Sequence, residues 1–321
     1  MIIYVLNLLR IRWISSHKFV NYSVNFTIYL WSKLRSNKIF IPHTFVKANS
    51  IKSPKISRGQ FEKITIVCVV TKKDFLTLPK VIFSAMKAIG HKNLAGIRIV
   101  VPDQHKLELY SLLKDLGPYK LEITTDEELM NSHQIISIRN HFGKNFSWII
   151  QQLLKFESVR TAKVNCLILD SDTYILNEKY LRIVDGLQPL TPSEEFHKTY
   201  YDFLSKVSPL FANTEFSFVP HHQIVQYDIF NEMCEFLQIS NLQDLIDICL
   251  NYADIKQSSP LCIDYELYAQ YIFRKHPNRF ILVKWSNISI ANSKFTFYTD
   301  KVFFIFVLRK FYNSISFHSW S

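Results

Sequence analysis

The chain has 321 residues, of which 48% are hydrophobic and 15% aromatic. This composition excludes an intrinsically disordered protein and allows one large domain, with or without an appendage. Its 6 glycines form neither a G-x-G-x-x-G sequence nor a P-loop, which excludes the common glycine-rich phosphate loops. The formal net charge is +11, and nearly all of it comes from the first 60 residues.

This leader, residues 1–60, contains ten Lys and Arg residues and no Asp or Glu. Apolar residues recur at helical spacing within 2–13 and again within 20–31. Neither apolar run is long enough to span a bilayer, so the pattern predicts helices that lie on an anionic membrane surface. Two alternatives stay open: an organelle transit peptide, and a segment that packs on the domain. The nearly neutral remainder of the chain argues against nucleic acid as a partner.

The last part of the leader, residues 48–60, is polar, contains Pro54 and Gly59, and is predicted to be a linker to the alternating strand and helix patterns that follow. In chain order, the sequence predicts a strand at 64–70, a helix at 78–89, a strand at 97–101, a helix at 106–116, a strand at 121–124, a helix at 146–160 and a strand at 164–169. This alternation indicates an α/β domain over residues 61–321, with a mostly parallel central sheet flanked by helices. Ligands of such sheets bind at the carboxyl ends of strands, where Thr71 and the segment 170–172 fall.

Two aspartates, Asp170 and Asp172, directly follow the apolar strand. Carboxylates two residues apart on an extended chain project to the same side. At the end of a buried strand they suit a hard divalent cation, which can hold the diphosphate of a nucleotide-sugar and neutralise its charge as it leaves. Because Asp-x-Asp also occurs in many solvated turns, this interpretation depends on the rest of the chain.

The predicted helix at 146–160 places Gln152 inside its apolar face and Lys155 at the border of that face. A core-facing glutamine needs a hydrogen-bond partner. Gln152 is therefore either a structural amide or a ligand contact. Thr71, Asp170, Gln152 and Lys155 are the candidates for binding the nucleotide-sugar.

A later helix, predicted at 263–276, places Asp264 at the centre of its apolar face and Glu266 on the opposite, polar face. An acid near a helix N-terminus can stay ionised even when it points inward. Asp264 is therefore the candidate for orienting or deprotonating an acceptor hydroxyl, with helix capping as the alternative.

Histidines supply three further candidates. His221 and His222 follow a strand-like run at 216–219, and at most one of two neighbours on a strand would enter a cleft. His318 lies in an aromatic tail that follows the apolar run 302–308, so we expect the tail to dock. A neutral imidazole there could complete a divalent-metal site. The five cysteines lack metal-site spacing and are expected to be buried thiols.

As a set, five segments resemble the DUF6492 family of glycosyltransferase-like proteins: WIIQQLLK at 148–155, LILDSDT at 167–173, VPHH at 219–222, DYELY at 264–268 and FHSW at 317–320. The resemblance covers residues 62–321. It implies a GT-A-like fold, a nucleotide-sugar donor and a divalent metal, Mn²⁺ or Mg²⁺, with Asp170, Asp172 and His318 as its ligands. On the acceptor side, the candidates are Asp264, Glu266, His221 and His222. Where the family commonly reads Ser-Glu-Tyr-Glu, this chain reads Ile-Asp-Tyr-Glu at 263–266.

These observations predict a metal-dependent glycosyltransferase at the cytoplasmic face of a membrane. Its acceptor would be a glycan or a lipid-linked molecule in cell-surface polysaccharide or lipopolysaccharide synthesis. The alternatives are an inactive transferase-like protein, a membrane-surface binding protein and a phosphatase of the haloacid-dehalogenase type. The phosphatase motif usually stands on the first strand, with Thr or Val where this chain has Tyr174.

Overall fold

The computed structural model describes residues 60–177, 181–193, 195–212, 214, 216–283, 286–300 and 302–318. Apart from Gln60, the predicted leader lies outside these residues, so its membrane, targeting and packing interpretations stay predictions. Within the described ranges, no helix is both long enough and apolar enough to span a membrane.

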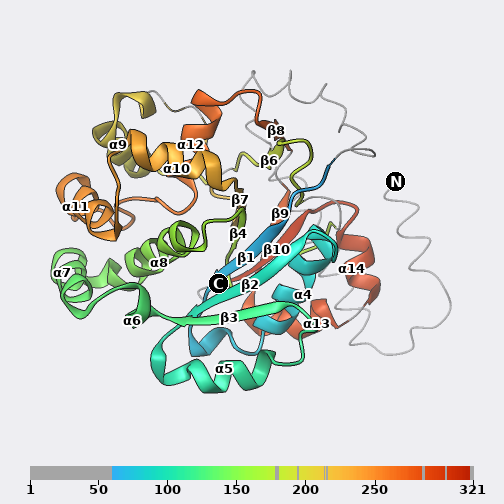
Figure 1. Cartoon of the computed structure of the whole chain (residues 1–321). Helices are drawn as coiled ribbons and strands as arrows, with labels where there is room; N and C mark the ends of the chain where they lie inside the picture. Colours follow the sequence, from blue (N-terminus) through green and yellow to red (C-terminus); the bar gives the residue numbers. More distant parts are fainter. Residues whose placement is uncertain are drawn as a thin grey trace. The chain divides into compact units, whose positions relative to one another are not determined.

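A five-stranded sheet forms the centre of the domain (Figure 1). Its strands in spatial order are β3 (Lys120–Thr125), β2 (Leu94–Val101), β1 (Ile64–Val69), β4 (Cys166–Leu169) and β7 (His222–Val225). Neighbouring strands run parallel except for β7, which pairs antiparallel with β4. The predicted fold class, a mostly parallel α/β sheet flanked by helices, is therefore confirmed.

The order of the strands creates a switch point between β1 and β4. From β1 the chain adds β2 and then β3 on one side, and it later returns to place β4 on the other side of β1. The connections that leave the carboxyl ends of these two neighbours therefore diverge. Open α/β sheets bind their ligands at such a position.

Helices cover both faces of the sheet. Val67 and Val69 of β1 pack into a core with α8 (Phe146–Ala162), α10 (Tyr227–Phe236), α11 (Leu242–Tyr252) and α12 (Glu266–Lys275). The alternate side chains of β1 point to the opposite face, which α4 (Leu78–Ile89) covers. This helix has Pro79 in its first turn and is followed by Gly90, whose φ of 87° is readily adopted only by glycine.

The other helices are α5 (Lys106–Leu113), α6 (Asp126–Leu129), α7 (Ser132–Phe142), α9 (Lys198–Val207), α13 (Phe295–Thr299) and α14 (Val302–Leu308). A two-stranded sheet joins β6 (Gln188–Leu190) to β8 (Phe280–Leu282), and a three-stranded sheet has the order β5 (Thr173–Ile175), β10 (Ser314–His318) and β9 (Asn287–Ala291). Because β10 pairs with β5, directly after Asp172, the predicted docking of the tail is confirmed for residues 314–318.

Several predicted bounds match the structure, and the helix at 78–89 matches it at both ends. The run at 216–219 is not a strand; β7 starts only at His222. The helix predicted from residue 263 starts at Glu266. In the segment before it, the Ile263 N–H donates to Gln152 Oε1 at 2.7 Å. All five cysteines are buried and free, as predicted.

Candidate active site

The segments that follow β1 and β4 meet at the carboxyl edge of the sheet. The Thr77 hydroxyl donates to the Ser171 carbonyl oxygen at 3.5 Å, which joins the two segments. Thr71 is exposed at this edge, and its N–H and hydroxyl both donate to the Asp74 carboxylate, at 2.9 and 3.0 Å. The structure thus brings Thr71 and the two aspartates to the predicted edge.

Lys155 is the centre of the candidate site. α8 carries its Nζ to within 2.5 Å of Asp170 Oδ1 and 2.8 Å of Asp264 Oδ2. Only 3% of the lysine side chain is exposed, so the predicted border position is wrong: the segment before α12 covers it. Burial alone would lower the pKa of Lys155, but the two carboxylates raise it above its ordinary value. Lys155 is therefore a buried, permanently charged cation.

Asp170 has a donor at each of its carboxylate oxygens. Besides Lys155, the Tyr265 hydroxyl donates to Oδ1 at 2.7 Å, and His221 Nδ1 lies 3.1 Å from Oδ2. Burial would raise the pKa of Asp170, but Lys155 and His221 lower it well below its usual range. A carboxylate offers about four lone-pair positions, and these three donors leave about one of them for a ligand.

Asp172 has different surroundings. Its side chain is partly exposed, and the Thr173 hydroxyl lies 3.4 Å from Oδ1. Its carbonyl oxygen accepts the Phe317 N–H at 2.9 Å. β10 therefore brings the backbone of His318 next to Asp172, although the His318 side chain lies outside the described part of the structure.

The donor set fits a divalent ion in part. Among the side chains that the structure describes, no group of three or more His, Cys, Asp and Glu residues is arranged to hold a metal. Asp172 offers a partly exposed carboxylate, Asp170 offers one open position, and the His318 backbone lies beside them. Carboxylate oxygens are the ligands that suit Mg²⁺ and Mn²⁺.

Gln152 faces inward, as predicted, and is 1% exposed. Its Oε1 accepts the Ile263 N–H, which supports the structural-amide interpretation. Its Nε2 is buried and has no hydrogen-bond partner among the described residues. One end of this amide therefore positions the segment before α12, and the other end is left for a ligand or a water.

Both acids of the 264–266 segment are buried, so the prediction that Glu266 lies on a polar face is wrong. Asp264 precedes α12, so its position on a helical projection does not give the direction of its side chain. Within α12, every residue from Glu266 to Ile272 is buried. The Glu266 carboxylate accepts hydrogen bonds from four groups: the Tyr201 hydroxyl, the Ser217 hydroxyl, the Phe218 N–H and the Gln270 amide. We therefore assign Glu266 a structural role, holding α12 to the segment around Ser217.

His221 and His222 lie in different environments. His221 has a φ of 64°, a left-handed conformation that is rare outside glycine and is often found at functional sites. Burial would lower its pKa, but Asp170 raises it above the ordinary value. His222 starts β7 and is 3% exposed; burial and the neighbouring His221 lower its pKa to about 4. His221 is thus the one of the two that faces the candidate site.

Sequence periodicity missed Tyr265, which contacts both Asp170 and Lys155. Tyr265 precedes the first residue of α12, so a helical projection says nothing about its direction. The signal that could have found it is chemical: a tyrosine between two acids, in a segment that the sequence already placed near a ligand.

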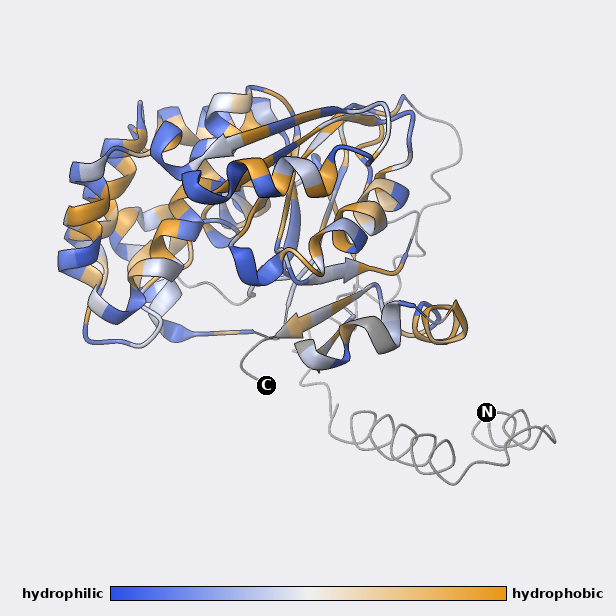
Figure 2. Ribbon diagram, turned by 90° about the horizontal axis from the view of Figure 1, so that it is seen from below, coloured by the Kyte–Doolittle hydropathy of each residue, from blue (hydrophilic) through white to orange (hydrophobic). Residues whose placement is uncertain are grey.

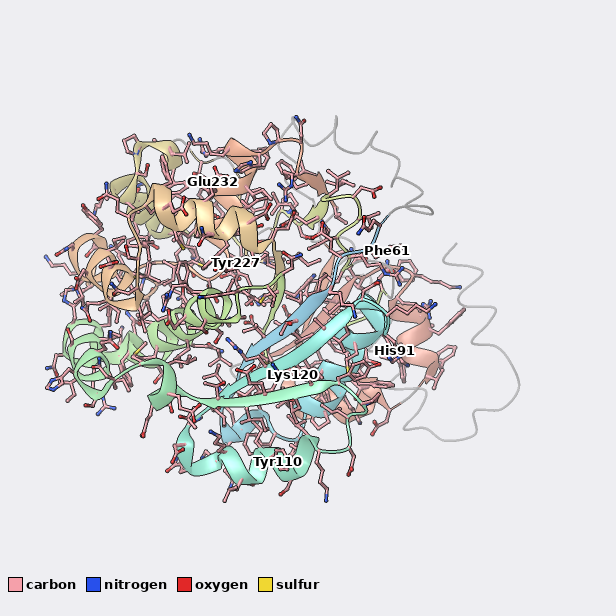
Figure 3. The ribbon with its side chains drawn as sticks, in the orientation of Figure 1. Phe61, His91, Tyr110, Lys120, Tyr227 and Glu232 are labelled. Carbon is pink, nitrogen blue, oxygen red and sulfur yellow. The ribbon has the colours of Figure 1, made fainter. Side chains whose placement is uncertain are left out.

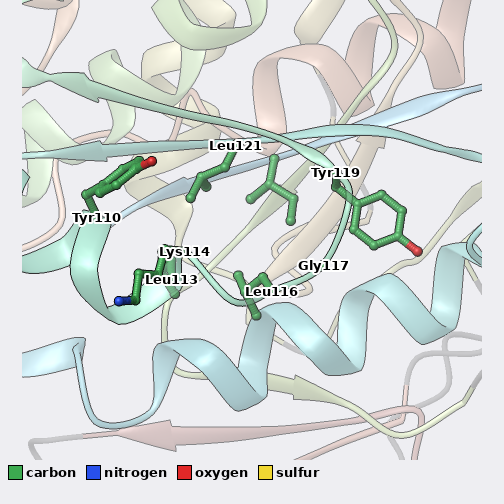
Figure 4. Close-up of a pocket in the computed structure, with 8 residues that line it drawn as sticks. Tyr110, Leu113, Lys114, Leu116, Gly117, Tyr119 and Leu121 are labelled. Carbon is green, nitrogen blue, oxygen red and sulfur yellow. The ribbon is translucent and has the colours of Figure 1, made fainter.

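A pocket of about 240 Å³ lies elsewhere (Figure 4). It is lined by Ile97, Tyr110, Leu113, Lys114, Leu116, Gly117, Tyr119 and Leu121. These residues come from α5, from the connection after it, and from the first halves of β2 and β3. Figure 3 labels Tyr110 of α5 and Lys120, the first residue of β3, in this part of the domain. The pocket is therefore displaced from the carboxyl ends of β1 and β4 and does not belong to the candidate site.

No family model matches the sequence, and no curated protein matches it. Solved structures of glycosyltransferases are similar to the chain in outline. Mouse xyloside xylosyltransferase 1 in its apo form is 12% identical, with a TM-score of 0.40 over 80% of this chain and 98% of that one. The galactosyltransferase LgtC, solved with donor and acceptor sugar analogs, is 11% identical, with a TM-score of 0.42 over 79% and 87%. The mannosyltransferase Ktr4p from S. cerevisiae is 13% identical, with a TM-score of 0.38 over 60% and 62%. With TM-scores below 0.5, these similarities do not transfer a function to this chain.

Proposed function

We propose that this chain is a metal-dependent glycosyltransferase with a nucleotide-sugar donor, as the resemblance to the DUF6492 family implies. One observation carries the proposal. Asp170 and Asp172 follow β4 at the switch point between β1 and β4, beside the docked C-terminal strand. This is where an open α/β sheet binds its ligand.

Asp172 and His318 would hold a divalent ion, Mn²⁺ or Mg²⁺, with the open position of Asp170 turned to the ion or to the nucleotide. When bound, such an ion neutralises negative charge on the departing nucleoside diphosphate. Lys155, Tyr265 and His221 fix the Asp170 carboxylate, so its orientation is set before the donor arrives. Thr71 and the Gln152 amide would lie on the donor side.

The surroundings of Asp264 favour a positioning role over direct proton abstraction. The side chain is 5% exposed, and Oδ2 accepts from Lys155 while Oδ1 accepts from the Tyr265 N–H at 3.2 Å. A general base has to reach the proton directly or through one water. We propose that Asp264 holds Lys155 and Tyr265 in place, and that His221 is the group nearest the acceptor.

We further propose that the acceptor is a glycan or a lipid-linked molecule of cell-surface polysaccharide or lipopolysaccharide synthesis, at the inner face of a membrane. The support is the leader, whose basic residues and apolar spacing suit an anionic leaflet. Equal transfer to soluble and lipid-linked acceptors of the same glycan would contradict this part of the proposal.

The first experiment measures thermal stability with UDP-, GDP- and CMP-linked sugars, with and without Mn²⁺. Wild type is compared with Asp172→Asn and with the control Asp202→Asn, which removes an exposed acid of α9 that pairs with Lys198. We expect an upward shift that requires both the metal and one nucleotide, since a ligand at a hundred times its Kd stabilises by about 2.7 kcal/mol. Asp172→Asn should lose the shift and Asp202→Asn should keep it.

Absence of a shift with every pair, in a folded protein, would contradict the proposal and favour the inactive transferase-like alternative. A shift with nucleotide alone, unchanged in Asp172→Asn, would contradict metal dependence while leaving a nucleotide site.

A further inference from the structure

Helix α14 is apolar on all sides, yet one of its sides faces solvent. Its seven residues are Val-Phe-Phe-Ile-Phe-Val-Leu, and Leu308 alone among them is buried. Val302, Phe303 and Phe306 are 81%, 63% and 51% exposed. A helix that is apolar all round is normally enclosed by protein or by lipid, and none of the residues that the structure describes encloses this side. Figure 2 shows the helix in orange at the right of the described domain.

The opposite side of α14 is anchored. The Phe304 ring packs edge-on against Tyr298 of α13, with ring centroids 5.7 Å apart. Phe295 of α13 packs in the same way against Phe317 of β10, at 4.8 Å. Through α13, these contacts hold the helix against the three-stranded sheet.

The exposed apolar side chains lie on one side of the helix, and two cationic residues follow them. At about 100° per residue, Val302, Phe303 and Phe306 fall within one side of the helix. Lys310 continues that side, and its Nζ lies 4.6 Å from the centroid of the Phe306 ring. Arg309 and Lys310 are both exposed. We name these five residues the α14 patch.

We propose that the α14 patch inserts into the surface of an anionic lipid bilayer. Phe303 and Phe306 would enter below the headgroups, while Arg309 and Lys310 would meet the lipid phosphates. An anionic lipid surface is the partner that this arrangement fits, because exposed Phe side chains bordered by Lys and Arg are typical of helices that lie in a membrane interface, and the two cations complement the lipid phosphates. The patch is outside both the leader and the candidate active site, so it can be tested independently of the proposed transfer reaction.

A site-specific probe separates this contact from any binding by the leader. Since all five native cysteines are buried, one new exposed cysteine can be labelled selectively in the full chain with an environment-sensitive NBD fluorophore. The label is placed through Phe303→Cys. The matched control is Leu107→Cys, at a residue of α5 that is 83% exposed.

With vesicles of phosphatidylcholine and phosphatidylglycerol, we expect the label at position 303 to brighten and shift to the blue, and the label at 107 to stay unchanged. Pure phosphatidylcholine should give a smaller response, because the cations lose their anionic partners. If the protein co-sediments with the anionic vesicles while the label at 303 does not respond, the proposal is overturned and the leader alone binds.

Two outcomes without vesicles would also overturn the proposal. A response at 303 that grows with protein concentration would identify a second copy of the chain as the occupant. A blue-shifted signal at every concentration would show that another part of the chain covers the patch. As a second variant, Phe303→Asp with Phe306→Asp should lower the partition coefficient of the full chain onto anionic vesicles about tenfold, from the loss of buried apolar area, whether or not the leader also binds. Leu107→Asp should leave the partition coefficient unchanged, and an unaltered partition coefficient in the double variant would contradict the proposal.

Discussion

The Phe317 N–H donates to the carbonyl oxygen of Asp172 at 2.9 Å, so the last strand of the domain is fastened to the turn that carries the candidate metal ligand. This bond joins residues 145 positions apart in the sequence. It places His318, the neighbour of Phe317, beside the Asp-Ser-Asp segment.

From this relationship we predict that His318 and Asp172 contribute to one metal site. His318→Ala and Asp172→Asn should each weaken Mn²⁺ binding about tenfold or more, because each removes one of few ligands. Isothermal titration of the full chain with Mn²⁺ measures this, and His197→Ala, a change at an exposed histidine, is the control. Unchanged affinity in both variants would remove the metal from the proposed function.

Lys155→Met should destabilise the fold by about 3–5 kcal/mol, because it leaves the carboxylates of Asp170 and Asp264 without their shared cation. Urea unfolding measures the difference. The control is Lys198→Met, which breaks an exposed pair with Asp202 and should cost less than about 1 kcal/mol. Equal effects of the two changes would show that the Lys155 network is not a buried charge cluster.

Glu266→Ala should also be strongly destabilising, by about 3 kcal/mol or more, because the Tyr201 hydroxyl, the Phe218 N–H and the Gln270 amide lose their buried acceptor. Glu235→Ala, which removes an exposed acid of α10, should change stability by about 0.5 kcal/mol or less. Urea midpoints of the two variants decide this, and a mild effect at Glu266 would restore it as an acceptor-side candidate.

His222 should make stability depend on pH. Its pKa is lowered from 6.5 to about 4 in the folded state, so the unfolded chain binds the proton more readily between these values. The stabilising contribution of neutral His222 to the free energy of unfolding is fully present above pH 6.5 and is lost as the pH falls toward 4. The total loss is about 3 kcal/mol. His222→Gln should flatten this part of the profile of unfolding free energy against pH. Parallel profiles for wild type and variant would contradict the prediction.

The elements of the fold that depend on local sequence could be predicted from the sequence. Strand β1, helix α4 and the position of Asp170 after β4 follow from apolar runs and their ends, which are properties of a few adjacent residues. Strand β7 was missed, because its antiparallel pairing with β4 depends on residues more than 50 positions apart. Such a pairing leaves no periodic signal in either segment.

The candidate site was harder for the same reason. A helical projection assumes that one side of the helix is buried and the other is exposed to solvent, but α12 is buried on all sides from Glu266 to Ile272. The burial of Lys155 depends on Asp264, which lies 109 positions further along the chain. The chemistry of their side chains made Lys155 and Asp264 candidates one at a time. Only the three-dimensional structure shows that they belong to one network of charges.

Between Leu308, where α14 ends, and Ser314, where β10 begins, the chain has only a short connection. The α14 patch is therefore connected to β10, and β10 pairs with β5, the strand that directly follows Asp172. With α14 seated in a bilayer, the turn would sit at a set height above the lipid. Such an arrangement would choose acceptors by how far their reactive hydroxyl stands from the membrane, so that the length of the acceptor becomes part of its recognition.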